Sequence, residues 1–139
     1  MLSTLIEQGY GEPEDLNCAE KILYGANEVY QLGLTPQALR IASGFGGGMT
    51  IGSVCGALTA AIMVLGILFV KYRAHESDKI KILTQELFDT YQEQMGDIDC
   101  TPLKDRYRRE DIKCKYVITK AATALDTIIK KEQDSIKHK

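Results

Sequence analysis

The chain has 139 residues, of which 45% are hydrophobic and 26% charged, and its formal net charge is −2. This composition excludes a disordered chain and suits one globular domain, while the near-neutral charge gives no basic field for nucleic acid. The only histidines are His75 and His138, which leaves little material for a Ser-His-Asp triad or a histidine-rich metal site. Any chemistry is therefore expected to rest on the four cysteines.

Two helices are predicted in the first third of the chain. Asn17 followed by Glu20 has the pattern of a capping box, and the helix that it starts is expected to end at Gly33. A Thr-Pro pair at residues 35–36 predicts a short second helix that stops at Gly44. The apolar face of the first helix contains Cys18, Ile22, Ala26, Val29 and Tyr30.

A glycine-rich loop, GFGGGM, occupies residues 44–49. A phosphate-binding loop is disfavoured, because no Gly-Lys-Ser/Thr follows the glycines and no strand is predicted before them. A turn that needs positive φ and close backbone approach is the favoured interpretation. Ser53 is then expected to cap the next helix, with Cys55 in its first turn.

No charged residue lies between Arg40 and Lys71. Within this stretch, residues 52–70 are long enough to span a bilayer, since about 20 apolar residues suffice, and Lys71 and Arg73 would form a cytoplasmic flank. The alternative is a central helix that other helices bury on all sides. Small residues dilute the stretch and the amphipathic segments around it need an apolar partner, so the buried helix is favoured.

Two longer helices and one helical turn are predicted after the uncharged stretch. The first covers residues 77–95 and ends at Gly96, a single turn starts at residues 101–102, and the last helix begins near Asp111. Cys114 lies on the apolar face of that last helix. The face continues with Val117, Ile118, Ala121, Ala122, Leu125, Ile128 and Ile129.

These elements predict an all-α fold, a compact bundle of about five helices around an apolar central helix. We expect a single domain over residues 1–139, with tails at 1–15 and 132–139. The first residues lack the basic and apolar regions of a secretory signal, so a cytoplasmic protein is expected, with neither nucleic acid nor a membrane as a partner. The alternative is an interaction or membrane-associated subunit whose apolar segment contacts a partner, and small residues there would also suit a homodimer.

The four cysteines are Cys18, Cys55, Cys100 and Cys114, and none forms a Cys-x-x-Cys pair. This spacing excludes zinc ribbons, thioredoxin-type motifs and local ferredoxin-type runs. Each cysteine lies at or near a predicted helix start, where unpaired amides stabilise anions and lower a thiol pKa. One cysteine alone is more often a small buried apolar residue, but four in this setting point to a shared site.

Two other features have plain structural interpretations. Residues 104–115 contain six bases and three acids, which add positive potential around Cys114. A solvated segment with salt bridges is favoured there over a phosphate- or RNA-binding patch. His75 is interpreted as a surface or capping residue rather than as a metal ligand or proton donor.

Three segments resemble a known family: NCAE at residues 17–20, RIASGFGGGM at residues 40–49, and CGALTAAIMVLG from Cys55 onward. Over residues 17–129 the chain resembles the redox-active proteins that are named after their cysteine pattern, C_GCAxxG_C_C. The central motif of that family reads Cys-Gly-Ala-x-x-Gly. Here Ala60 stands in place of its final glycine.

The resemblance implies that all four cysteines belong to a redox-active site, without attaching a reaction or substrate to it. Members of the family often lie beside transporter genes. A similar domain in split-Soret type cytochromes accompanies haem and an iron–sulfur cluster. Haem is not expected in this chain, because it has no C-x-x-C-H motif.

We expect the four thiolates to converge at one end of the bundle and to bind an iron–sulfur cluster, [2Fe–2S] or [4Fe–4S], for electron transfer or redox sensing with an unidentified partner. Gly46, Gly47, Gly48 and Gly56 are expected to let backbone amides approach that cofactor. Two alternatives use the same cysteines. They are metal-free thiol/disulfide chemistry and a structural zinc site.

Overall fold

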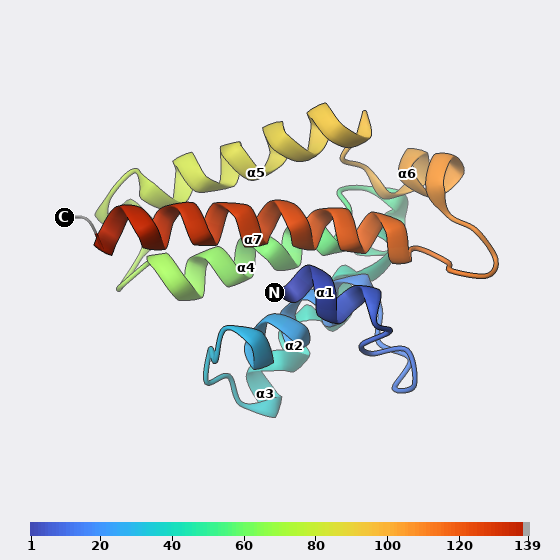
Figure 1. The fold of residues 1–139 in the computed structure, drawn as a ribbon, viewed down its shortest axis with the longest axis horizontal. Helices are drawn as coiled ribbons and strands as arrows, with labels where there is room; N and C mark the ends of the chain where they lie inside the picture. Colours follow the sequence, from blue (N-terminus) through green and yellow to red (C-terminus); the bar gives the residue numbers. More distant parts are fainter. Residues whose placement is uncertain (138–139) are drawn as a thin grey trace.

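The computed structural model describes residues 1–137, so His138 and Lys139 lie outside the described residues. Figure 1 shows that the described residues form an all-α fold without strands, as predicted. The α-helices are α1 (Leu2–Glu7), α2 (Cys18–Val29), α3 (Pro36–Leu39), α4 (Gly56–Phe69), α5 (Lys79–Met95), α6 (Cys100–Tyr107) and α7 (Lys115–Lys137). Shorter helical turns cover Arg40–Phe45 (η1), Gly48–Gly52 (η2) and Ala74–Glu76 (η3).

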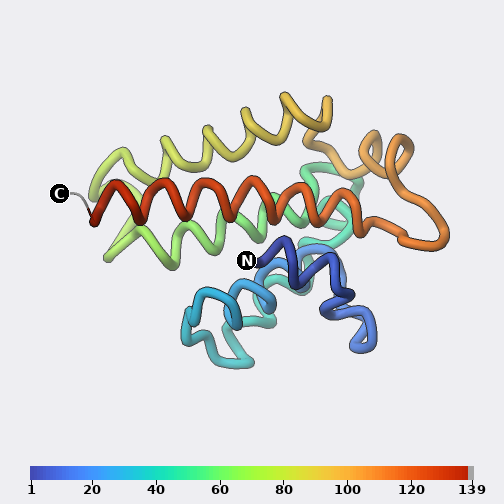
Figure 2. The backbone as a smooth tube through the Cα atoms, in the orientation of Figure 1, coloured from blue at the N-terminus to red at the C-terminus, as the bar shows by residue number. Residues whose placement is uncertain are grey.

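Helix α4 is the centre of the bundle. It packs against α2, α5 and α7, and Figure 2 shows its path between them. Its fully buried residues are Ala57, Leu58, Ala60, Ala61, Val64 and Leu65. The prediction of a buried central helix is therefore confirmed, and burial on several sides explains why this stretch has no charge. None of the described helices has the length and apolar character needed to cross a membrane.

Both predicted tails are wrong where the structure describes them. Residues 1–15 contain α1, whose Leu2 and Ile6 are buried in the core. Helix α7 continues to Lys137, and its Glu132 pairs with Lys79 of α5 at 2.8 Å. The number of helices is larger than predicted, because α1 and α6 have six and eight residues and are shorter than the window in which apolar periodicity is recognised.

The carboxylate of Asp126 on α7 anchors the first two helices. It accepts hydrogen bonds from the amides of Leu2 (3.2 Å) and Ser3 (2.9 Å) at the start of α1, and from the hydroxyl of Tyr30 at the end of α2. Asp126 is only 2% exposed, so these donors satisfy a carboxylate that is almost completely removed from water. Burial and the bond to Asp126 both raise the pKa of Tyr30.

The connection between α4 and α5 lies at the far end of α4 from Cys55. The carboxylate of Glu76 closes it by accepting hydrogen bonds from the amides of residues 71–73, at 2.7–2.9 Å. These bonds lower the pKa of Glu76. His75 lies in the same turn and is exposed, which confirms its interpretation as a surface residue.

Candidate functional site

All four cysteines line one small cavity, at the end of the bundle where α2, α4, α6 and α7 begin. Cys18 and Cys100 are the first residues of α2 and α6, while Cys55 and Cys114 immediately precede α4 and α7. The sequence had placed them at helix starts, and the structure brings those four starts together. The cavity has a volume of about 30 Å³, and its remaining lining residues are Gly47, Leu103, Lys104 and Val117.

Two backbone hydrogen bonds hold Cys55 beside Cys100. The amide of Cys55 donates to the carbonyl of Ile98 (2.8 Å), and the amide of Cys100 donates to the carbonyl of Ser53 (2.6 Å). Together they form a short antiparallel bridge between segments that lie far apart in the sequence. The predicted Ser53 cap is wrong, because Ser53 takes part in this bridge and α4 begins only at Gly56, with Cys55 as its cap residue.

Cys18 is positioned by the predicted capping box, which the structure confirms. The Asn17 side chain accepts from the amide of Glu20 (2.9 Å), and the Glu20 carboxylate accepts from the amide of Asn17 (2.9 Å). Asn17 also donates to the carbonyl of Ser43 (3.0 Å), which ties the start of α2 to η1 just before the glycine loop. The thiol of Cys18 packs against Gly56, where an added Cβ would lie 2.7 Å from its Sγ.

Cys114 follows a closed loop at residues 109–113. The amide of Arg109 donates to the carbonyl of Lys113 (3.2 Å), and Lys113 has a φ of 51°. The carbonyl of Cys114 accepts the first helical bond of α7 from the amide of Ile118 (3.0 Å). The last helix therefore starts four residues later than Asp111, because the closed loop occupies the residues that were assigned to its first turn.

The glycine loop packs against the cysteines with left-handed backbone, as its composition predicted. Gly47 and Gly48 both have a φ of 63°, and Gly47 lines the cysteine cavity. An added Cβ on Gly48 would lie 2.7 Å from the Cβ of Cys100, and one on Gly46 would lie 2.6 Å from the side chain of Asn17. These glycines thus allow close packing around the site, and their contact with a cofactor stays a prediction.

Burial controls the acidity of the thiols. Burial, followed by the neighbouring Cys18, raises the pKa of Cys55 to about 12. Burial also raises the pKa of Cys100 and of Cys114, and in both cases the charge of Lys104 opposes the rise. The expected lowering of the pKa at helix starts is wrong for these three thiols. The loss of water outweighs the amides of Ala57 and Leu58 at Cys55, and it outweighs the charge of Lys104 at Cys100 and Cys114.

In the reduced, metal-free protein we expect Cys55 to be alkylated much more slowly than a free thiol at pH 8, because the thiolate is the nucleophile. The rate should keep rising toward pH 12. The folded protein holds the proton of Cys55 more tightly than the unfolded chain does. The neutral thiol therefore stabilises the fold fully below pH 9.0, the ordinary thiol pKa, and this stabilisation is lost as pH rises toward 12. Mass spectrometry of alkylated peptides over this pH range measures the profile, and a plateau near pH 9 would contradict it.

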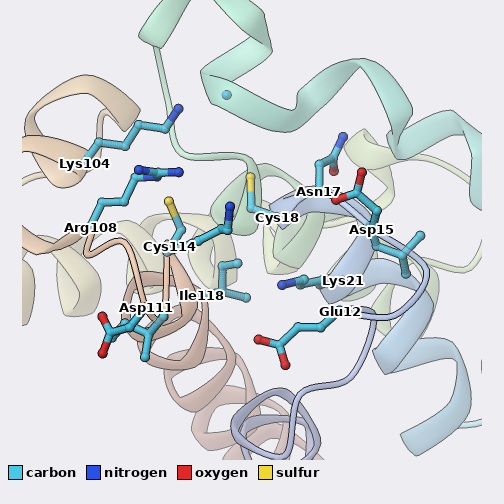
Figure 3. Close-up of a pocket in the computed structure, with 14 residues that line it drawn as sticks. Glu12, Asp15, Asn17, Cys18, Lys21, Lys104, Arg108, Asp111, Cys114 and Ile118 are labelled. Atoms are coloured by element: carbon cyan, nitrogen blue, oxygen red, sulfur yellow. The ribbon is translucent and has the colours of Figure 1, made fainter.

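A larger pocket of about 370 Å³, here called the outer pocket, adjoins the cysteine cavity. The two share Cys18, Gly47, Lys104 and Cys114 as lining residues. Figure 3 shows Lys104 and Arg108 beside the thiol of Cys114. The outer pocket therefore gives solvent access to Cys18 and Cys114.

The basic residues of this pocket were missed as site residues. The sequence predicts a solvated segment at residues 104–115, and Lys104 and Arg108 are indeed exposed, but both also line the pocket. A signal was present, because Lys104 follows Cys100 by four residues and shares its face of a helix. The sequence predicts only a single helical turn there, and a single turn does not place residues 100 and 104 on one helix face.

The donors present suit an iron–sulfur cluster, whose ligands are cysteine thiolates. Four thiols converge, Gly47 leaves one wall without a side chain, and the aliphatic Leu103 and Val117 form much of the rest. Within residues 1–137, no group of three or more His, Cys, Asp or Glu side chains stands in an arrangement that would hold a single metal ion.

Comparison with protein families gives a match to the family model described as "Putative redox-active protein (C_GCAxxG_C_C)", over residues 16–128. The chain belongs to the C_GCAxxG_C_C family. Ala60, which replaces the last glycine of the C_GCAxxG_C_C central motif, is fully buried in α4, so the core accommodates its methyl group. Comparisons with curated proteins and with solved structures give no match.

Proposed function

We propose that the protein is a redox protein in which Cys18, Cys55, Cys100 and Cys114 bind one iron–sulfur cluster, for electron transfer or redox sensing. The observation that supports this most strongly is that the four thiols line a single cavity. They come from the starts of four separate helices, and they are all the cysteines of the chain. Cysteines that serve only as small apolar residues would be expected at scattered positions in the core.

The electrostatics of the metal-free site support a positively charged occupant. Burial raises the pKa of three of the thiols, and Cys18 adds to the rise in each case. Four adjacent thiolates would repel one another in this buried place, so they need cationic iron to become ligands, and binding releases their protons. A bound cluster would supply one-electron chemistry.

The residues around the thiols have defined roles in this proposal. Leu103 and Val117 keep water away from the sulfurs, and Lys104 offsets negative charge at the open side of the cavity. The solvent exposure and charge around a cluster set its reduction potential. The identity of the redox partner, a cytoplasmic location and the formation of a homodimer remain predictions.

Anaerobic reconstitution with iron and sulfide tests the proposal. We expect the wild-type protein to retain both elements after desalting and to show the visible absorption of an iron–sulfur cluster. A variant with all four cysteines replaced by serine is the matched control and should retain neither. Wild-type protein without bound iron and sulfide, or with zinc or iron alone, would overturn the cluster assignment.

A metal-free thiol/disulfide cycle is the second candidate, and the neighbourhood of Cys18 and Cys55 favours it. The Sγ of Cys18 packs against Gly56, and Cys18 is the neighbouring charge that most affects the pKa of Cys55. A small-molecule disulfide would oxidise this pair to a Cys18–Cys55 disulfide and would itself be reduced to two thiols. Thiol counting and peptide mapping after mild oxidation test this cycle, and four free thiols after treatment would exclude it.

A further inference from the structure

We propose that the outer pocket binds the anionic group of a small molecule, a carboxylate or an inorganic oxyanion, beside Cys114. This anion site adds to the proposed function by naming the class of molecule that reaches the redox site. The biological purpose of the anion site therefore rests on the proposed function. The binding itself depends only on residues of this chain. It can therefore be tested on the metal-free protein.

The position and size of the outer pocket fit a small ligand. Its volume of about 370 Å³ lies within the range of small-molecule sites. Cys18 and Cys114, which line it, are partly exposed, whereas Cys55 and Cys100 are buried. A molecule in this pocket would therefore meet the cysteine site through Cys18 and Cys114.

Two cations at the inner end of the pocket are available to an anion. Lys104 on α6 and Arg108 just after it both line the pocket, and Figure 3 shows their charged ends together on one side of the Cys114 thiol. Neither takes part in an ion pair among the described residues. The planar guanidinium of Arg108 suits a carboxylate or oxyanion, which it can bind through two parallel hydrogen bonds.

The acidic residues of the pocket restrict the ligand to a small one. Figure 3 shows the carboxylates of Glu12 and Asp111 farther from the Cys114 thiol than the charged ends of Lys104 and Arg108, and the carboxylate of Asp15 on the Cys18 side of the pocket. Glu12 is also 3.9 Å from Lys115, its closest cation. An extended polyanion such as a nucleic acid would meet these carboxylates, whereas a small anion beside Cys114 would contact Lys104 and Arg108.

The rates at which iodoacetate and iodoacetamide alkylate Cys114 test the proposal. The two reagents are similar in size, but iodoacetate has a carboxylate where iodoacetamide has a neutral amide. The fraction of thiolate affects both rates at Cys114 equally, so it cancels when the iodoacetate rate is divided by the iodoacetamide rate. This ratio therefore reports on the attraction of the anionic reagent. In the reduced, metal-free protein, Lys104→Gln/Arg108→Gln should lower this ratio about fivefold, as expected for two partly exposed ionic contacts.

The matched control is Lys81→Gln/Lys137→Gln, which removes the same charge from exposed positions on α5 and α7 and should leave the ratio unchanged. Lys104 and Arg108 are themselves exposed, so their variant should keep the wild-type circular dichroism spectrum. Inorganic phosphate should slow the iodoacetate reaction more than chloride does at equal ionic strength, in the wild type only. An unchanged ratio in Lys104→Gln/Arg108→Gln, or equal effects of phosphate and chloride, would overturn the anion site and leave the proposed function standing.

Discussion

Gly56→Ala is expected to lower the free energy of unfolding by about 1–3 kcal/mol, although alanine is the better helix former. A Cβ at position 56 would lie 2.5 Å from the carbonyl oxygen of Phe45 and 2.7 Å from the Sγ of Cys18. Because the first of these is a backbone atom at the end of η1, the clash cannot be relieved by a side-chain rotation. Displacement of Cys18 should also reduce the iron retained after reconstitution.

Gly66→Ala is the matched control, since it makes the same change in the same helix. An added Cβ at Gly66 meets no atom within 4 Å. This variant should therefore be stabilised by about 0.5–1 kcal/mol, the ordinary gain of alanine over glycine in a helix. Urea unfolding of both variants measures the difference. Equal effects at the two positions would show that Cys18 does not pack against α4 as described.

Asp126→Ala is expected to destabilise the protein by about 3 kcal/mol, because it leaves one buried donor and two partly buried donors without a partner. The donors are the amides of Leu2 and Ser3 and the hydroxyl of Tyr30. Their loss should release α1 from α7. Urea or thermal unfolding measures the loss of stability. Faster hydrogen exchange at the amides of α1 would show that the loss arises where α1 packs against α7.

Asp134→Ala provides the control on the same helix. Asp134 is half exposed and pairs with Lys130 at 3.0 Å, an i,i+4 contact worth about 0.5 kcal/mol or less. Tyr30→Phe removes one of the three donors and should show an intermediate loss. In a double-mutant cycle, Tyr30→Phe should add little to Asp126→Ala, and fully additive effects would contradict the shared hydrogen bond.

The sequence predicted best the features that depend on neighbouring residues. The capping box of Asn17 and Glu20 is such a feature, and so is the stop of α5 at Gly96, whose φ is 81°. The apolar face of α7 is another, because its period is sustained over several turns. The all-α fold and the buried central helix followed from these local patterns.

The sequence failed where a distant partner decides the local structure. Ser53 could cap a helix, but its carbonyl pairs with the amide of Cys100, and this bond delays the start of α4. Leu2 belongs to a helix because Asp126, more than a hundred residues later, binds the amide of Leu2. No local pattern records such a pairing.

The candidate site shows the same division. The positions of the cysteines at helix starts were predictable, since each start has its own local signals. The rise in the pKa of Cys55 was not, because it depends on how deeply the assembled bundle buries the thiol. The role of Lys104 and Arg108 in the outer pocket likewise depends on the closed loop that brings Cys114 to α6.

Iron X-ray absorption spectroscopy of the reconstituted, monomeric protein tests the central claim most directly. The chain has only four cysteines, so a cluster whose irons are bound by sulfur alone must use all of them. We predict iron coordinated only by sulfur, with an iron–iron distance present in the spectrum. Nitrogen or oxygen ligands on iron, or the absence of a second iron, would show that the four thiols do not serve one cluster.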